Sequence, residues 1–181
     1  MGVFHVERGF FGRLRLFLAS ALPFILPISS TFMAWKGLCI STNSPVPIIC
    51  VISESMAPAF HRGDLLITWN WTPSAEVGDI PVIWFDGHLL PMVHRVIQVY
   101  PGESSNGAIS LRHTFLTKGD NNELSDVALY PMPRTSVSRK EVVGFVRGYI
   151  PFLGWVVIYL RENYWARCII GLLLISAIFR T

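Results

Sequence analysis

The chain has little charge for its size. Only 15% of its 181 residues are charged, against roughly 25% in an average globular protein, while 51% are hydrophobic. The net charge is +3, and the Lys and Arg residues do not form the basic stripe that a phosphate-binding surface needs. We therefore expect no nucleic acid partner. Contact with membrane lipid is the first expectation, and the length allows one compact domain plus an anchor.

Cysteine is scarce as well. Cys39, Cys50 and Cys168 are the only three, and their wide spacing excludes a disulfide framework and a Cys-x-x-Cys zinc site. A bridge from Cys39 to Cys50 stays open on an extracytoplasmic side, but we favour three small buried apolar side chains. No cofactor is implied.

The first long feature is an uncharged run from Leu16 to Trp35. As a helix rising roughly 1.5 Å per residue, it matches a hydrocarbon core about 30 Å thick. Pro23 and Pro27 lie inside it, and membrane helices tolerate such prolines. A cleaved signal peptide is the competing interpretation, but its apolar core is usually only about 7 to 15 residues long. We predict an uncleaved anchor over residues 16–35.

The charges that flank this segment predict its orientation. Three arginines precede it and one lysine follows it closely (Arg8, Arg13, Arg15 and Lys36). The positive-inside rule then places residues 1–15 in the cytosol and residues 36–165 on the lumenal or extracytoplasmic side. Asn70, in Asn70-Trp71-Thr72, is the only glycosylation candidate, and it is consistent with that side.

Residues 47–150 predict strands. Short apolar or alternating runs rich in Val, Ile, Trp and Phe are separated by turn pairs such as Gly63-Asp64 and Asp86-Gly87. Nine prolines between residues 45 and 133 argue against a long helix here. The candidate strands are Ile48–Ile52, Asp64–Trp69, Pro81–Phe85, Met92–Tyr100, Ile109–Leu116 and Val142–Arg147. We predict a mainly β domain.

The C-terminus is apolar again. Cys168 to Phe179 is an uncharged run whose helix would measure about 18 Å, shorter than a bilayer. We predict a short apolar segment over residues 166–181 at or in the membrane. Tyr149 to Leu160 is also apolar, but Pro151 and Gly154 make it a poor helix, so we expect it to complete the domain core.

Two serines follow the first predicted strand, in Ser53-Glu54-Ser55-Met56-Ala57-Pro58. A serine where a strand gives way to a turn can expose its Oγ and leave backbone amides free to hold an oxyanion. It still needs a base within hydrogen-bond reach. The alternative is that Ser53 and Ser55 are ordinary turn residues.

His94 is the candidate base. In a strand, alternation places His94 on one face with Met92 and Val96, and Arg95 on the other. A lone imidazole on an apolar face is unusual, although a structural core histidine is the alternative. The remaining histidines lack such a setting: His5, His61, His88 and His113.

The polar stretch from Thr117 to Asp126 supplies carboxylates. Asp120 or Asp126 could orient a histidine, as the third member of a catalytic triad does. The alternatives are a simple turn, a calcium loop, or a metal site that includes His94. The stretch lacks the ligand series, central Gly and terminal Glu of an EF-hand, and the chain has no His-x-x-x-His pattern.

Taken together, the order and spacing of these three motifs resemble the catalytic subunits of the eukaryotic endoplasmic-reticulum signal peptidase complex, the Ser-His-Asp branch of the type I signal peptidase family. The flanking segments Phe32–Leu38 and Val143–Gly148 extend the likeness over nearly the whole chain.

The resemblance implies a role for each matching residue. Ser55 would be the nucleophile, His94 the general base and then acid, and Asp126 the carboxylate that orients His94, with Asp120 as second choice. The Ser53 hydroxyl would join the Ser55 amide in the oxyanion hole. Bacterial relatives use a Lys base where this chain has His94, and a dyad with Lys118 is the less favoured alternative.

It also implies a type I signal peptidase-like β domain on a single N-terminal transmembrane helix. Such a protein is a serine endopeptidase that cleaves N-terminal signal peptides of secretory and membrane preproteins, together with other complex subunits. Its place would be the endoplasmic reticulum membrane, with the N-terminus cytosolic and the catalytic domain lumenal. Together with partner membrane subunits, the short C-terminal helix would thin the bilayer locally.

The chain departs from the family pattern at three positions. Glu54 replaces a common Gly, Ala57 a common Glu, and Ser125 the first of two adjacent Asp. If the family Gly adopts a positive φ, Glu54 would be strained there, and its charge would oppose a developing oxyanion. Glu54 therefore motivates a second hypothesis, a noncatalytic membrane-tethered scaffold of the same fold.

Overall fold

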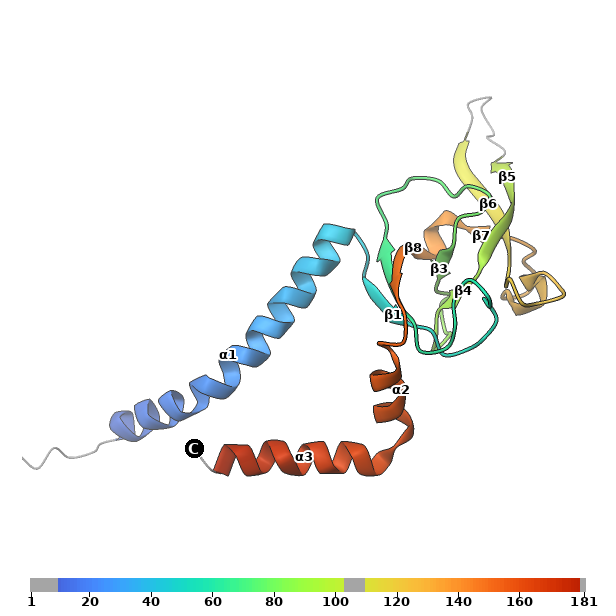
Figure 1. The fold of residues 1–181 in the computed structure, drawn as a ribbon. Coiled ribbons are helices and arrows are strands. Elements are labelled where there is room, and N and C mark those ends of the chain that lie inside the picture. Colours follow the sequence, from blue (N-terminus) through green and yellow to red (C-terminus); the bar gives the residue numbers. More distant parts are fainter. Residues whose placement is uncertain (1–9, 103–109, 180–181) are drawn as a thin grey trace, which may run out of the picture. The chain divides into compact units, whose positions relative to one another are not determined.

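The computed structural model describes residues 10–102 and 110–179. The chain divides into two compact units, with the boundary between Ser41 and Thr42. The first unit consists of helix α1, and the second holds all the described strands and helices α2 and α3 (Figure 1). The N-terminal residues His5 and Arg8 lie outside the described part of the chain.

Helix α1 (Phe10–Thr42) contains the predicted segment 16–35 and extends beyond it at both ends. Within it, Leu22–Thr42 is long and apolar enough to cross a membrane. The helix continues through its two prolines, Pro23 and Pro27. One turn after the second, the Thr31 hydroxyl donates to the carbonyl of Pro27 at 2.8 Å.

The strands form two antiparallel sheets, so the mainly β prediction is confirmed. The five-stranded sheet has the order β1 (Ile48–Cys50), β2 (Leu65–Trp69), β8 (Val142–Ile150), β3 (Pro81–Ile83) and β4 (Met92–Val93). The three-stranded sheet has the order β5 (Arg95–Gly102), β6 (Ser110–Lys118) and β7 (Val137–Ser138).

One segment predicted as a single continuous strand is interrupted in the structure. The expected run Met92–Tyr100 is two strands, because β4 ends at Val93 and β5 begins at Arg95. The chain passes from one sheet to the other at His94, so β4 and β5 pair with different partners, β3 and β6. Strand β6 begins at Ser110, and the predicted start at Ile109 lies outside the described residues.

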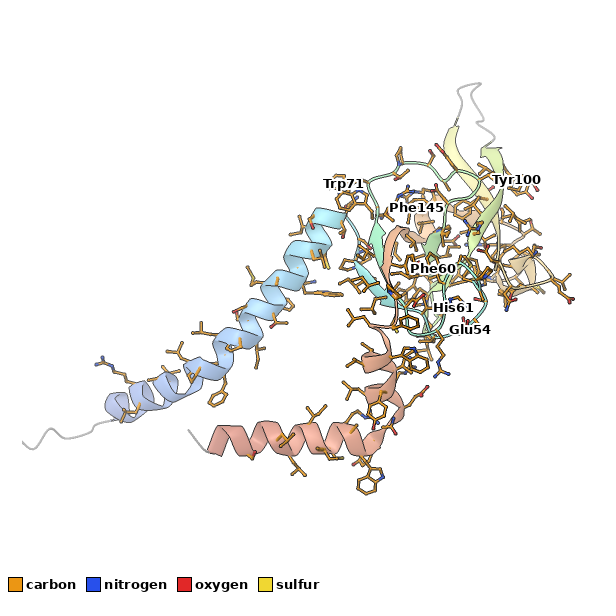
Figure 2. All side chains as sticks on the ribbon, viewed as in Figure 1. Glu54, Phe60, His61, Trp71, Tyr100 and Phe145 are labelled. Atoms are coloured by element: carbon orange, nitrogen blue, oxygen red, sulfur yellow. The ribbon has the colours of Figure 1, made fainter. Side chains whose placement is uncertain are left out.

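Buried apolar side chains form two clusters. The larger, which contains Phe115 and Phe145, joins residues of both sheets. The smaller contains Met56, Phe60 and Leu66 and underlies the turn that carries Ser55. Figure 2 labels Phe60 and Phe145, one from each cluster. Burying such a side chain stabilises the fold by about 1.5 to 3 kcal/mol, so both sheets and the serine turn share one stable framework.

The C-terminal region corrects a second prediction. Helix α2 (Trp155–Glu162) occupies part of the segment expected to be non-helical, and α3 (Tyr164–Phe179) follows it. Pro151 and Gly154 do not disrupt α2 because both precede its first residue, and Gly154 is the N-cap. The short apolar C-terminal helix is confirmed as α3.

Helix α2 is tied to the loop that precedes β2. The N–H of Gly154 donates to the carbonyl of Gly63 at 2.8 Å. Gly63 has a φ of +94°, and a Cβ there would lie 2.3 Å from the Trp155 indole, so this position requires glycine. Arg62 adds an ion pair to Glu162. These contacts fix α2 beside the serine turn.

Candidate active site

Ser55 lies in the turn that follows β1. The ends of this loop are held together by two backbone hydrogen bonds, from Val51 N to Asp64 O and from Gly63 N to Val51 O, both 2.9 Å. The Ser55 carbonyl accepts from the Asn121 N–H at 2.9 Å. The turn that carries Ser55 is therefore fixed from two sides, and the half-buried Ser55 side chain faces the sheets.

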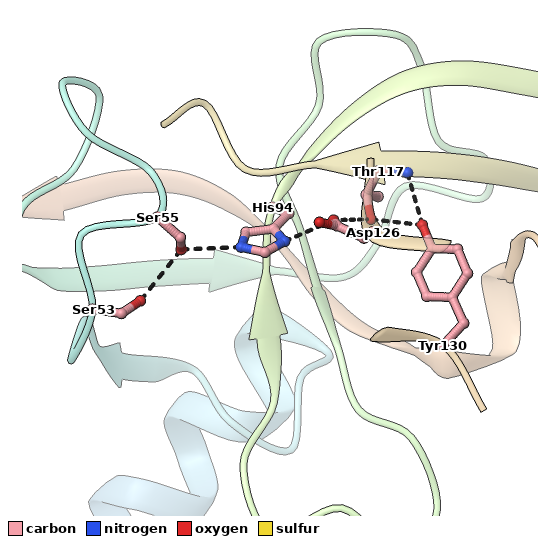
Figure 3. Close-up of polar contacts among 6 residues, drawn as sticks. All are labelled: Ser53, Ser55, His94, Thr117, Asp126 and Tyr130. Atoms are coloured by element: carbon pink, nitrogen blue, oxygen red, sulfur yellow. Dashed lines mark hydrogen bonds and ion pairs between the residues drawn. The ribbon is translucent and has the colours of Figure 1, made fainter. Parts of the chain in front are cut away.

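His94 lies at the junction of the two sheets, between β4 and β5, and is 6% exposed. Its Nε2 is 3.0 Å from Ser55 Oγ, and its Nδ1 is 2.7 Å from Asp126 Oδ2 (Figure 3). Val96 is buried on the same side as His94, whereas Ile97 is 41% exposed, as the predicted alternation requires. The structure thus brings together three of the side chains selected from the sequence.

Asp126 is the first residue of the short 3-10 helix η1 (Asp126–Leu129) and is 1% exposed. A carboxylate only accepts hydrogen bonds, so the proton of His94 lies on Nδ1 and faces Asp126. The unprotonated Nε2 then accepts from the Ser55 hydroxyl. This is the tautomer in which an imidazole can take a proton from a serine.

Ser53 contributes a second hydroxyl. Its Oγ lies 3.3 Å from Ser55 Oγ, and the Ser53 side chain is exposed beside the cavity described below. It can therefore reach an oxygen atom that develops charge next to Ser55. The arrangement of Ser53, Ser55, His94 and Asp126 can support nucleophilic attack on a carbonyl carbon.

Asp120 has a different partner. Its two carboxylate oxygens accept from Arg95 Nε at 2.8 Å and from Arg95 Nη2 at 2.7 Å. The hydrogen bond from Arg95 holds the pKa of Asp120 below its ordinary value, while partial burial opposes that shift. Across the described residues, no three His, Cys, Asp or Glu side chains are grouped to hold a metal ion.

Glu54 fits the turn beside Ser55 without strain. In the described part of the chain, Asn43 and Phe152 are the only non-glycine residues with a positive φ, so Glu54 has a negative one. Its Oε1 accepts from the Arg62 N–H at 3.0 Å, which directs the exposed carboxylate toward the far end of the same loop. The strain that motivated the scaffold hypothesis is therefore absent.

A cavity of about 470 Å³ adjoins Ser55 and His94. Its lining is mostly apolar and comes from β1 and the two residues after it, β4, η1 and α2: Ile49, Val51, Ile52, Met92, Val93, Leu129, Val157 and Ile158. Arg161 of α2 also lines it. Sequence reasoning missed the contribution of α2, because it assigned that segment to the domain core.

Two further polar residues lie behind Asp126. The Thr117 hydroxyl is 2.7 Å from Asp126 Oδ2 and 2.9 Å from the Tyr130 hydroxyl (Figure 3). Sequence reasoning used Thr117 only as the start of the acidic stretch and did not select Tyr130. In the sequence, this threonine and this tyrosine indicate only strand and core positions. The hydrogen bonds that link them to Asp126 are visible only in the folded structure.

The remaining candidates are also placed. The Oδ1 of Asn70 accepts from Arg139 Nη2 at 2.7 Å, and the residue is half-buried. Lys118 is the last residue of β6 and pairs with Arg95 in the sheet. All three cysteines are free thiols, and the side chain of His113 lies outside the described part of the chain.

The comparisons with known proteins give one consistent result. No protein-family model matches the chain. It is 45% identical to the signal peptidase complex catalytic subunit SEC11 of Arthroderma otae, over 84% of this chain and 86% of the relative. It is 45% identical to the sec11 subunit of Aspergillus oryzae, over 83% and 84%, and 44% identical to that of Arthroderma benhamiae, over 84% and 86%.

Proposed function

Because the chain belongs to the family of signal peptidase complex catalytic subunits, we propose that it is a serine endopeptidase that removes N-terminal signal peptides from preproteins. The observation that carries the serine mechanism is the hydrogen-bonded series from Ser55 Oγ through His94 to Asp126, with distances of 3.0 and 2.7 Å. Nucleophile, base and orienting carboxylate are each within hydrogen-bond reach of the next.

Acylation begins when His94 Nε2 takes the Ser55 proton and Oγ attacks the scissile carbonyl carbon. The imidazolium that forms is stabilised by the carboxylate of Asp126. The Ser53 hydroxyl and the Ser55 N–H stabilise the oxyanion. His94 then gives its proton to the leaving amine, and the peptide bond breaks to leave an acyl-enzyme.

Deacylation uses the same groups in reverse. A water molecule that enters beside Ser55 loses its proton to His94 and attacks the acyl carbon. The Ser55 oxygen leaves and recovers its proton from His94. The mostly apolar cavity beside Ser55 binds the substrate as an extended chain whose alternate side chains face the protein. We expect small residues one and three positions before the cleaved bond.

The proposed membrane arrangement is the one that the sequence predicts. Residues 16–35 of α1 form the anchor, residues 1–15 face the cytosol and residues 36–165 form the lumenal peptidase domain at the endoplasmic reticulum membrane. The short apolar segment 166–181 contacts lipid and, with other complex subunits, thins the bilayer. On the lumenal side Asn70 is the candidate for glycosylation.

The test is signal-peptide cleavage by the purified complex from cells whose own catalytic subunit has been replaced by this chain. We expect the unchanged chain to cleave a preprotein and Ser55→Ala and His94→Ala to lose cleavage while assembling normally. Ser125→Ala, a neighbouring serine in the acidic stretch, is the matched control and should stay active. Full cleavage by Ser55→Ala would refute the serine mechanism.

A further inference from the structure

A buried polar network continues behind Asp126. Thr117 on β6 is fully buried, and Tyr130, which follows η1, is 4% exposed. In the β5–β6 pairing Thr117 lies opposite Val96, two residues beyond His94. Paired residues share a face of the sheet, so the Thr117 side chain is on the same face as His94. The fold therefore places Thr117 directly behind the proposed triad.

The donor and the acceptor in each of these hydrogen bonds can be assigned in only one way. The Asp126 carboxylate accepts only, so the single proton of the Thr117 hydroxyl points to Asp126 Oδ2 at 2.7 Å. The contact of 2.9 Å between Thr117 Oγ1 and Tyr130 OH must then be donated by the tyrosine. The Tyr130 oxygen in turn accepts from the Thr117 backbone N–H at 2.9 Å. Burial raises the pKa of Tyr130, which keeps its donor proton in place.

Asp126 depends strongly on this arrangement. Its Oδ2 accepts from both His94 Nδ1 and Thr117 Oγ1, whereas its Oδ1 is buried and has no hydrogen-bond partner among the residues described. Within that part of the chain, the Thr117 hydroxyl is thus one of only two donors to the carboxylate. A buried carboxylate with a single donor is poorly stabilised and free to rotate.

We propose that Thr117 and Tyr130 are positioning residues for the reaction: the Tyr130 hydroxyl orients the Thr117 hydroxyl, which holds Asp126 Oδ2 against His94. The inference rests on the proposed function, since it assigns a role through His94 and Asp126. Neither residue lines the substrate cavity, so their loss changes the rate of the chemical step and leaves substrate binding unaltered.

Three variants test this in the assembled complex. Thr117→Val keeps the shape and removes the donor, and should lower kcat roughly ten- to a hundred-fold with KM unchanged, as expected for a lost hydrogen bond to a charged group. Thr117→Ser restores the hydroxyl and should restore most of the rate. Tyr130→Phe keeps the ring and should lower kcat roughly three- to ten-fold, because only a neutral hydrogen bond is lost.

Thr68→Val is the matched control. Thr68 is also fully buried, and its hydroxyl donates to the Val46 carbonyl at 2.7 Å, away from the triad. The Thr68→Val variant should lose about as much stability as Thr117→Val and keep the wild-type kcat. A purely structural role for Thr117 would give the two valine variants the same kcat in correctly assembled complexes, and would leave Thr117→Ser no better than Thr117→Val.

The outcomes separate this inference from the proposed function. If the unchanged chain cleaves and Ser55→Ala does not, while Thr117→Val and Tyr130→Phe keep the wild-type kcat, only the positioning role is refuted. Cleavage by Ser55→Ala would refute the serine mechanism itself. If Thr117→Val fails to assemble, the rates of Thr117→Ser and Tyr130→Phe decide: a wild-type kcat for Tyr130→Phe contradicts the inference.

Discussion

His94 and Arg95 are consecutive residues, yet each pairs with a carboxylate in a very different environment. The His94 and Asp126 side chains are 7% and 1% exposed, whereas those of Arg95 and Asp120 are 34% and 20% exposed. Both carboxylates come from the segment that runs from the end of β6 to the first residue of η1. The junction between β4 and β5 therefore carries one of these pairs on each of its two faces.

The difference in burial supports the proposed division between a chemical role for His94 and Asp126 and a structural role for Arg95 and Asp120. In a dry site, an unprotonated imidazole held by a carboxylate can take a proton from Ser55 at little cost in reorganisation. The Arg95–Asp120 pair is charged near neutral pH and partly solvated, so it contributes only about 0 to 1 kcal/mol to stability. Its bidentate geometry instead fixes the direction of the turn that contains Asp120.

That turn contacts the segment that carries Ser55. Asn121 donates its backbone N–H to the Ser55 carbonyl and its Nδ2 to the Glu54 carbonyl, at 2.9 and 3.2 Å. Asp120 thus lies in the turn that contacts Ser55, whereas Asp126 contacts His94 directly. The residues alone left the choice between these carboxylates open, and the resemblance ranked Asp126 above Asp120; in the structure the two have distinct partners.

The largest expected difference is between His94→Ala and Arg95→Ala. Loss of the base should lower kcat for signal-peptide cleavage by roughly 10⁴-fold or more. Loss of Arg95 frees the supporting turn and should cost roughly ten-fold. Both are measured in purified complexes matched for assembly. Equal losses would contradict the separation of the two pairs.

Gly119→Ala should have an intermediate effect. A Cβ at this position would lie 2.7 Å from the Ser55 carbonyl oxygen, so the turn must move away from the nucleophile. We expect kcat to fall roughly ten- to a hundred-fold and the unfolding free energy to fall by about 1 to 3 kcal/mol. Gly148→Ala is the control, because its nearest neighbour would be an ordinary contact at 3.9 Å. Wild-type kcat in Gly119→Ala would show that the turn does not position Ser55.

The smallest effect concerns stability in acid. Because Arg95 lowers the pKa of Asp120, this carboxylate stabilises the fold above its unfolded pKa of about 3.9, and the contribution is lost as pH falls through the lower folded value. Asp120→Asn should therefore reduce the stability lost on acidification by about 1 kcal/mol or less. The check is the thermal unfolding midpoint of the complex at about pH 6 and about pH 3.

Asp86→Asn, a change at an exposed carboxylate in the turn after β3, is the control for this measurement. It should leave the acid-induced change in the unfolding midpoint as it is in the unchanged chain. An Asp120→Asn variant that behaves like Asp86→Asn would mean that the Arg95 pair contributes nothing to stability.

Sequence reasoning found the parts of the molecule that depend on local pattern. The apolar runs of α1 and α3, the alternation around His94 and the turn residues between strands are all encoded within a few neighbouring positions. The break in the strand at His94 was missed, because the passage from one sheet to the other depends on which strands pair, and alternation does not report that.

The residues that support the site were harder to find. Thr117, Asn121 and Tyr130 form hydrogen bonds with residues of other segments. Thr117 and Asn121 lie in the Thr117–Asp126 stretch, but nothing in its pattern marks them as supporting residues, and Tyr130 lies outside it. The choice between Asp120 and Asp126 likewise depended on which of them could reach His94. Spacing along the chain carries no such information, whereas burial and hydrogen-bond distance do. The catalytic roles of these residues stay predictions.

The most direct test of the account is the rate of signal-peptide cleavage by Asp126→Asn relative to Asp120→Asn, measured in complexes of equal assembly. An amide at position 126 presents a donor to His94 Nδ1 and favours the wrong tautomer, so kcat should fall roughly 10³- to 10⁴-fold. Asp120→Asn should lose roughly ten-fold or less. An equal loss, or a larger loss in Asp120→Asn, would contradict the assignment of Asp126 as the carboxylate that holds His94.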